Sequence, residues 1–242
     1  MGIGYITRLF DKYSVSVCGS KGSGKDLVTA NVIARRRKPY VSNMNYNVRA
    51  QWYPFEYKAL DVGGNTYKNF ISGEVNPYTF PYPDGTDVYI SDAGIYFPSQ
   101  YNGELNRDYK EFPTFMAISR HVGDCRVHIN SQNPNRTWDK IREQNDYWLR
   151  CKRSYVLFGK ICITTLTEYD KYESALSRVR PCRVRTPLLG NKVARMQAQI
   201  YRDQFYNQHG TVRNRLLIYW NRSKYNTRQF KEIMNTNEHP QS

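Results

Sequence analysis

The segment GSKGSGKD, residues 19–26, constrains the fold of this chain more than any other feature. It follows residues 13–18, a short run of β-branched and small side chains that predicts a strand, and it leads into residues 27–38, whose pattern predicts a helix that ends before Pro39. A strand that enters a helix through a glycine loop directs several backbone N–H groups toward one point, where the helix dipole also favours anions. The order therefore predicts a loop that binds phosphate groups.

The loop offers the residue types that a nucleotide site of this kind requires. Gly19, Gly22 and Gly24 lack a Cβ, so the backbone can approach phosphates closely, and the ammonium of Lys25 would reach the terminal phosphates. The expected ligand is ATP with Mg²⁺, and the alternative is a Gly/Ser-rich surface turn with an incidental lysine. The candidate nucleotide-binding residues are Gly19, Ser20, Lys21, Gly22, Ser23, Gly24, Lys25 and Asp26.

Position 26 departs from the usual pattern, in which a Ser or Thr hydroxyl binds Mg²⁺. The residue here is Asp26, whose carboxylate can also bind the metal but adds negative charge beside the triphosphate. Asp is also a favoured residue at a helix N-cap. We therefore consider Asp26 either a metal ligand or a helix cap.

A second acidic position follows residues 87–91, a short apolar run that predicts a strand. The run ends at Asp92, and an Asp at this point is expected to hold Mg²⁺ directly or through water. The next residue is Ala93, where most nucleotide hydrolases with this loop carry the Glu that orients the attacking water. Glu104 is the nearest downstream carboxylate that a loop could supply instead.

Further polar residues are candidates for catalysis. Gln132 follows a predicted strand at 126–130 and is our candidate sensor of the terminal phosphate. Arg120 and Arg142 are candidates for an arginine finger supplied to a neighbouring subunit, because a guanidinium neutralises charge that develops in phosphoryl transfer. Each could equally be an ordinary surface arginine. His121 is better explained as a structural or subunit contact than as a general base.

The order of predicted elements indicates an α/β fold with a mostly parallel sheet flanked by helices. Residues 1–170 form the expected nucleotide-binding domain, with an irregular insertion at about 44–86 that is rich in turn residues. Strands are also expected at 147–150, 155–158 and 161–167. Residues 171–242 form a basic, mainly helical C-terminal region, with amphipathic helices expected at 193–208 and 212–222.

The charge of the chain is strongly positive, +15, and it is concentrated toward the C-terminal end. Residues 171–242 contain 14 Lys and Arg against 4 Asp and Glu. Aromatic side chains, from totals of 21 Tyr and 4 Trp, are interleaved with the cations and can stack on bases. DNA is therefore the expected polyanionic partner of the C-terminal region.

The cysteines and the hydropathy of the chain indicate where in the cell the protein is expected. The 5 cysteines show no spacing typical of zinc ligands and are expected to be reduced and buried. No apolar run approaches the roughly 18 residues that span a bilayer, and the N-terminus does not resemble a signal peptide. We expect a cytoplasmic protein.

Several of these motifs occur together in a known order. The segments are GSKGSGKD, VYISD followed by AGIYFPS, and SRHVGDCRVHINSQNPNRTWDKIR. Over about residues 13–165 the chain resembles the zonular occludens toxin-like (Zot-like) P-loop ATPase family of filamentous phages, which is related to the FtsK/HerA class of DNA-pumping motors. The resemblance implies a P-loop NTPase fold of the RecA/FtsK-like type.

The resemblance also implies a function and roles for single residues. Members are ATP-driven, ring-forming homo-oligomers that act on a single-stranded phage genome during packaging or extrusion, with virion-assembly proteins or the host inner membrane surface as further partners. It implies that Lys25 binds the phosphates, that Asp92 is the acid of the metal site and that Gln132 is the sensor. Arg120 or Arg142 would act in trans.

Three functions remain open from the sequence. The first is a viral ATPase that packages, translocates or extrudes genomic DNA. The second is a nucleotide-binding and DNA-binding assembly adaptor that has lost hydrolysis, because Asp26 and Ala93 depart from the usual pattern. The third is a nucleotide kinase, which also uses this loop but requires an arginine-rich lid and an acceptor pocket that the motifs fit poorly.

Overall fold

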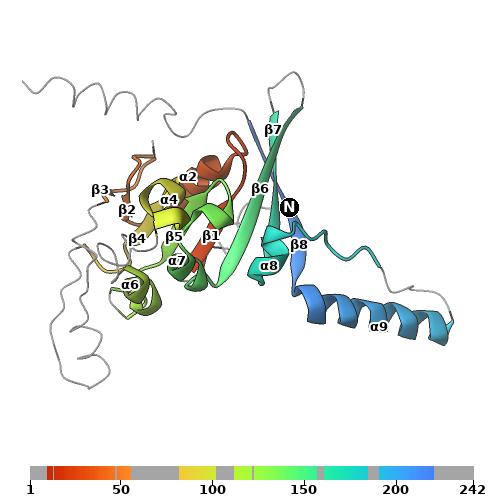
Figure 1. Cartoon of the computed structure of the whole chain (residues 1–242). Coiled ribbons are helices and arrows are strands. Elements are labelled where there is room, and N and C mark those ends of the chain that lie inside the picture. The colour runs from red at the N-terminus through yellow and green to blue at the C-terminus, as the bar shows by residue number, and fades with distance from the viewer. Residues whose placement is uncertain are drawn as a thin grey trace, which may run out of the picture.

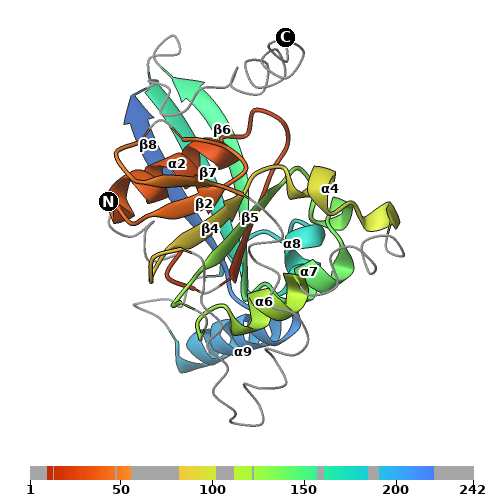
Figure 2. The ribbon, with the colours of Figure 1, turned by 90° about the vertical axis from the view of Figure 1, so that its left-hand side faces the viewer.

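The computed structural model describes residues 10–12, 14–46, 48–55, 82–101, 112–121, 123–156, 161–184 and 191–220. These residues form one sheet with helices on both faces (Figures 1 and 2). The strands are β1 Ser14–Cys18, β2 Tyr40–Ser42, β3 Trp52–Pro54, β4 Asp87–Ile90, β5 Val127–Ser131, β6 Tyr147–Val156, β7 Ile161–Tyr169 and β8 Val212–Trp220. The helices are α2 Lys25–Arg36, α4 Ala93–Tyr96, α6 Phe112–Ile118, α7 Asp139–Glu143, α8 Tyr172–Leu176 and α9 Lys192–His209, with the 3-10 helices η2 Ser99–Tyr101 and η3 Pro134–Arg136.

The sheet is mostly parallel, as the sequence predicts. Its strand order is β3-β2-β4-β5-β1-β6-β7-β8. The pairs from β3 to β6 are parallel, whereas β7 pairs antiparallel with both β6 and β8. Strand β5 lies between β1 and β4, so the carboxyl ends of these three strands meet at one edge of the sheet. This edge is where ligands bind in open α/β sheets.

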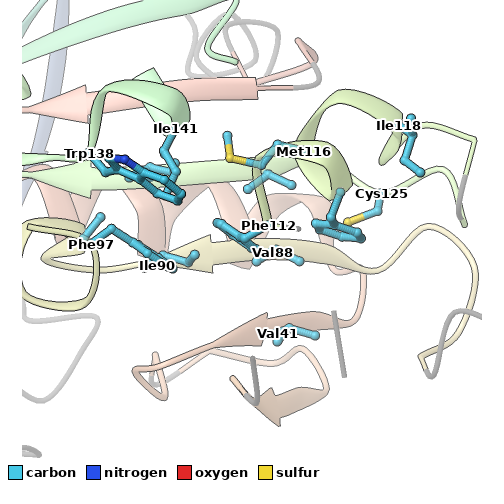
Figure 3. Close-up of a cluster of buried hydrophobic side chains, with 14 residues drawn as sticks. Val41, Val88, Ile90, Phe97, Phe112, Met116, Ile118, Cys125, Trp138 and Ile141 are labelled. Carbon is cyan, nitrogen blue, oxygen red and sulfur yellow. The ribbon is translucent and has the colours of Figure 1, made fainter. Parts of the chain in front are cut away.

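Strand β4 shows why the central strands are apolar along their whole length. All of its residues are buried because helices cover both faces. Val88 and Ile90 point to one face and pack in a cluster with α6 and α7, which includes Phe112 and Trp138 (Figure 3). Tyr89 points to the other face and packs in a cluster with α2. Each large side chain that is fully buried in these clusters contributes about 1.5–3 kcal/mol.

The helix after the phosphate loop is held by its apolar stripe. Val28 and Val32 of α2, one turn apart, pack with Val15 and Val17 of β1. The helix ends at Arg36, and Arg37 adopts a left-handed conformation with φ 53° before Pro39. The predicted strand-loop-helix unit is therefore confirmed.

Two predicted elements differ from the structure. Residues 147–156, expected to begin two strands, form the single long strand β6, because β7 pairs with it over its last nine residues. Residues 212–220, expected to start a helix, form strand β8, which pairs with β7 along nine residues. The helix expected at 193–208 is confirmed as α9. The sheet therefore includes a strand from the region beyond residue 170.

Other predictions fall partly outside the described residues. Residues 56–81 of the expected insertion, Glu104 and residues 221–242 belong to the parts that the structure does not describe. The described start of the insertion contributes the edge strand β3, which pairs parallel with β2. Three cysteines, Cys18, Cys125 and Cys151, are buried free thiols, as expected. Cys182 is also a free thiol but is only partly buried, so the expectation of burial is wrong for this residue. None of the helices that the structure describes has the length and apolar character that crossing a bilayer requires.

Candidate nucleotide-binding site

The phosphate loop joins the carboxyl end of β1 to the first turn of α2, and its glycines are required by geometry. Gly22 and Gly24 have φ angles of 77° and 91°, in the left-handed region that favours glycine. A Cβ on Gly19 would lie 2.7 Å from the carbonyl oxygen of Cys151 and 2.4 Å from Oγ of Ser23. Because Ser23 is buried and its hydroxyl has no hydrogen-bond partner among the described residues, the loop contains a polar group suited to a ligand.

Lys25 and Asp92 come together at this edge of the sheet. Lys25 is the first residue of α2 and only 4% exposed. Its Nζ atom lies 3.6 Å from Oδ1 of Asp92, which follows β4. Asp92 has a left-handed conformation, with φ 48°, at the N-cap of α4. The structure therefore places the acidic end of one strand beside the lysine that follows another, two strands away.

Asp26 does not cap its helix. The N-cap of α2 is Gly24, and Asp26 lies in the first turn, so the interpretation of Asp26 as a helix cap is wrong. Its Oδ1 atom accepts hydrogen bonds from Oγ of Ser91 at 2.7 Å and from Nδ2 of Asn130 at 2.9 Å. The carboxylate thereby connects α2 to the ends of β4 and β5. A negative charge in the first turn is also favoured by the helix dipole.

The polar network around Asp26 includes residues that sequence reasoning missed. Asn130 also donates to Oγ1 of Thr29 at 3.1 Å. The amide of Asn43 accepts a hydrogen bond from N–H of Ser91 and donates one to its carbonyl oxygen, both at 2.8 Å. Ser91 and Asn130 lie at the ends of strands that the sequence did predict, and a polar residue at a strand end was the signal that could have identified them.

Gln132 lies where the sequence placed it, close to Asp92. Both residues line a pocket together with Gly94, Ile95 and Arg136. Arg136, in η3, was not among the predicted site residues, although it follows Gln132 by four positions. A Cβ on Gly94 would lie 3.3 Å from Cβ of Arg136, so the absence of a side chain at Gly94 allows α4 and η3 to approach each other.

The first candidate arginine finger, Arg120, and the neighbouring His121 lie away from the phosphate loop of their own chain. Arg120 and His121 follow α6, near the amino ends of β4 and β5, where N–H of Gly85 donates to the carbonyl oxygen of Gly123. Nε of Arg120 donates to Nε2 of His121 at 2.9 Å. The phosphate loop is at the opposite edge of the sheet, so neither residue reaches it within one chain.

Arg142 is held by contacts within the chain. Its Nη1 atom donates to the hydroxyl of Tyr172 at 2.9 Å and to Oδ1 of Asn135 at 3.4 Å. The guanidinium also lies 5.2 Å from the centre of the Tyr172 ring, a cation–π distance. These contacts connect α7 to α8 and are those of a structural arginine.

The thiols near the loop are not suited to nucleophilic chemistry. Burial, opposed mainly by Arg150, raises the pKa of Cys18 to about 11. Burial also raises the pKa of Cys151 well above its usual value, with Cys18 and Asp26 contributing. Because the thiolate is the reactive form, both side chains act as packing groups at neutral pH.

The donor set fits a magnesium ion bound together with phosphates, but not a metal site built from protein alone. Within the part of the chain that the structure describes, no group of three His, Cys, Asp or Glu side chains could hold a metal. Mg²⁺ is commonly bound through one or two carboxylates with phosphate oxygens and water. Asp26, the residue after Lys25 in α2, and Asp92, whose Oδ1 lies 3.6 Å from Nζ of Lys25, provide the carboxylates. Oδ1 of Asp92 is buried without a hydrogen bond among the described groups.

Together, these features define the P-loop NTPase fold. A glycine loop leads from β1 into α2, an Asp ends β4, and the strand between them, β5, ends at the polar segment that contains Gln132. The P-loop NTPase fold expected from the sequence, a mostly parallel sheet flanked by helices, is thus confirmed.

Comparisons with known proteins find similar structures but no similar sequences. No protein-family model and no curated protein matches the chain. Among solved structures, the chain is similar to the N-terminal domain of zonular occludens toxin from Neisseria meningitidis, with 13% identity and a TM-score of 0.44 over 90% of this chain and 96% of that one. This is the family that the sequence motifs resemble.

Two further structures are similar over different shares of the chain. The genome packaging NTPase B204 from Sulfolobus turreted icosahedral virus 2, in complex with AMP, shows 14% identity and a TM-score of 0.38 over 58% of this chain and 75% of that one. The ATPase DotB from Legionella pneumophila shows 10% identity and a TM-score of 0.40 over 98% of this chain and 64% of that one. These are likenesses of fold.

Proposed function

We propose that this chain is a viral, phage-like ATPase that binds ATP with Mg²⁺ and uses its hydrolysis to package, translocate or extrude genomic DNA during virion assembly. The observation that carries the proposal is the pairing of Lys25 with Asp92 at the carboxyl edge of the sheet, 3.6 Å apart. The motif resemblance to the Zot-like family supports the DNA-directed part.

Each residue at this edge has a role in the proposal. The loop from Gly19 to Gly24 binds phosphate oxygens through backbone N–H groups, and Lys25 binds the terminal phosphates. Asp92, and Asp26 through its Oδ2 atom, hold the metal, because Oδ1 of Asp26 already accepts two hydrogen bonds. Mg²⁺, when bound, neutralises charge on the phosphates. Gln132 orients the attacking water or senses the terminal phosphate from the pocket that it shares with Asp92.

An arginine from a neighbouring copy completes the site in this proposal. Arg120 is exposed at the amino edge of the sheet, far from the loop of its own chain, which is compatible with action in trans in a ring-like homo-oligomer. Arg142 is the weaker choice because it is bound to Tyr172 within the chain. DNA, expected to be single-stranded, contacts the basic C-terminal region.

A second candidate function is a nucleotide-binding, DNA-binding assembly adaptor without hydrolysis. Ala93, at the position of the usual catalytic acid, is completely buried. Among the described residues that line the pocket, Asp92 is the one carboxylate. A site that lacks a group to orient water can lose about 10²-fold or more in turnover while it retains phosphate binding.

Phosphate release separates these functions. We expect the purified chain to hydrolyse ATP in the presence of Mg²⁺, faster with single-stranded DNA, and the Lys25→Ala variant to be slower by about 10²-fold or more. Lys12→Ala is the matched control, because Lys12 is an exposed lysine just before β1, outside the loop, and its loss removes the same charge.

Equal and slow phosphate release by wild type and Lys25→Ala would contradict an ATPase. Calorimetry with magnesium nucleotide would then decide for the adaptor if the wild type binds and Lys25→Ala does not. An absence of binding heat in the wild type would contradict both functions.

A further inference from the structure

Strand β6 is longer than β1 and continues past its end, so the last part of β6 lies beside the phosphate loop. In the parallel register, Cys18, the last residue of β1, pairs with Arg150. The residues of β6 after Arg150 continue in antiparallel pairing with β7 alone, from Cys151 opposite Leu166 to Val156 opposite Ile161. In Figure 2, β6 and β7 continue beyond the ends of the parallel strands. This extension runs alongside the loop instead of alongside another strand.

The side chain of Arg153, in this extension of β6, lies against the phosphate loop. A Cβ placed on Gly24 would be 3.3 Å from Cδ and 3.7 Å from Cβ of Arg153, and 3.1 Å from Oγ1 of Thr164. Because side chains alternate along a strand, Arg153 shares a face with the buried Cys151, whose carbonyl oxygen lies close to Gly19. Nε of Arg153 is buried. The stem of the arginine is therefore packed at the junction of the loop with α2.

The charges at this junction favour a further cation when phosphates are present. Two carboxylates, those of Asp26 in the first turn of α2 and Asp92, belong to this site, and Nζ of the buried Lys25 lies 3.6 Å from Oδ1 of Asp92. Asp92 lies on the side of the loop toward β4, whereas Arg153 lies on the opposite side, on β6. A guanidinium presents a planar fork of donors that matches phosphate oxygens.

We propose that Arg153 is a phosphate-binding residue of the nucleotide site, which contacts the phosphate chain of a nucleoside di- or triphosphate from the side opposite Asp92. This inference rests on the proposed nucleotide site. A residue with this role contributes to binding of ground state and transition state alike, so its loss raises KM and Kd and leaves kcat nearly unchanged.

Calorimetry with MgADP and with a nonhydrolysable ATP analogue tests the role. The variant Arg153→Gln keeps the first two methylene groups of the stem but removes the charge, and we expect it to weaken binding of both ligands by about 10- to 100-fold. Arg153→Lys keeps the charge without the fork, so we expect partial recovery. Lys152→Ala is the matched control, since Lys152 is exposed on the other face of the same strand and should leave affinity unchanged.

The readouts distinguish this role from a structural one. Unchanged nucleotide affinity in Arg153→Gln, with a lower melting temperature of the ligand-free protein, would overturn the proposal and assign Arg153 to packing. An equal fall in kcat and kcat/KM would also overturn it, because that pattern marks an interaction made in the transition state alone. If the wild type binds neither ligand, the proposed function fails together with this inference, whereas binding by wild type and Arg153→Gln alike refutes the role of Arg153 only.

Discussion

At the scale of single residues, Asp26 shows how an acid can occupy a position where a hydroxyl is usual. Its Oδ1 atom accepts hydrogen bonds from Ser91 and Asn130, and bonds to a carboxylate are roughly twice as strong as bonds between neutral groups. The donors lie at the ends of β4 and β5, so the same carboxylate fixes the relative positions of the loop helix and the two strand ends that form the site. The departure from the usual pattern therefore has a structural role in addition to the proposed metal role.

The burial of His128 predicts how the free energy of unfolding should depend on pH. It is buried in β5, and its ring centre lies 5.1 Å from that of Phe10 and 4.9 Å from that of Tyr89. Burial, and then the charges of Arg36 and Arg126, lower the pKa of His128 well below its usual value of 6.5. The folded protein keeps the ring neutral, whereas the unfolded chain binds a proton below about pH 6.5. Stability should fall as the pH falls below that value, and this residue contributes a slope of up to about 1.4 kcal/mol per pH unit.

Urea unfolding at a series of pH values measures this contribution. We expect His128→Phe, which places a third aromatic ring among aromatic neighbours, to lose less stability per pH unit than the wild type. His121→Gln is the control because His121 is an exposed histidine. Comparing slopes removes any constant packing penalty. A slope in His128→Phe equal to that of the wild type would refute the assignment.

At the scale of elements, the strand-loop-helix unit and strands β4 and β5 could be predicted because their signals are local. A glycine loop, an apolar run and a strand-terminal Asp each occupy a few consecutive residues, so Lys25, Asp92 and Gln132 could be placed at one sheet edge. The hydrogen-bond partners of Asn43 and Asn130 could not be predicted in this way, because they depend on which strand ends become neighbours. Strand order is a property of the whole sheet.

Strand β8 shows the limit of local patterns. The segment VRNRLLIYW contains apolar and basic residues that suit one side of a helix as well as an edge strand, and its own sequence does not decide between them. Pairing with β7 decides, because it forms a ladder along nine residues of β8 and places Arg215 beside the buried Glu168. Contacts distant in sequence thus override the local preference.

An ion pair between β8 and β7 identifies the arginine that we expect to stabilise β8 in the sheet. Nε of Arg215 donates to Oε1 of Glu168 at 2.9 Å, and Glu168, 1% exposed, also accepts from the hydroxyl of Tyr147 at 3.2 Å. Arg215→Ala would leave a buried carboxylate without its cation, so we expect the free energy of unfolding to fall by on the order of 2–4 kcal/mol. Arg213→Ala, which removes an exposed arginine from the same strand, should change it by less than about 0.5 kcal/mol.

Denaturant unfolding of Arg215→Ala and Arg213→Ala under the same conditions tests this expectation. Equal effects of the two substitutions would mean that β8 is held by its backbone pairing alone. A loss confined to Arg215→Ala would support β8 as an integral strand, since a helix in this region would not place the arginine against Glu168.

At the scale of the whole molecule, the nucleotide site and the basic helix are separate. The site occupies the carboxyl edge of the parallel strands, whereas α9 extends away from the sheet (Figure 1). Its C-terminal part is anchored, because Phe205 packs against a cluster that contains Trp148 and Val212. The rest of the helix presents Lys192, Arg195 and Arg202 along its length. A long polymer such as DNA could therefore contact α9 without entering the nucleotide site.

This separation leads to a prediction about DNA binding. Replacing Lys192, Arg195 and Arg202 with Ala should weaken binding of single-stranded DNA and reduce the slope of log affinity against log salt by up to about 2, since each lost phosphate contact removes about 0.7. Nucleotide affinity should not change, because the three residues are remote from the loop. Alanine at Gln197 and Gln204, neutral and exposed on the same helix, is the control. Because substitutions on the exposed helix leave β8 in the sheet, the comparison tests charge and not folding. An unchanged salt slope in the triple variant would place the DNA contact elsewhere in the chain.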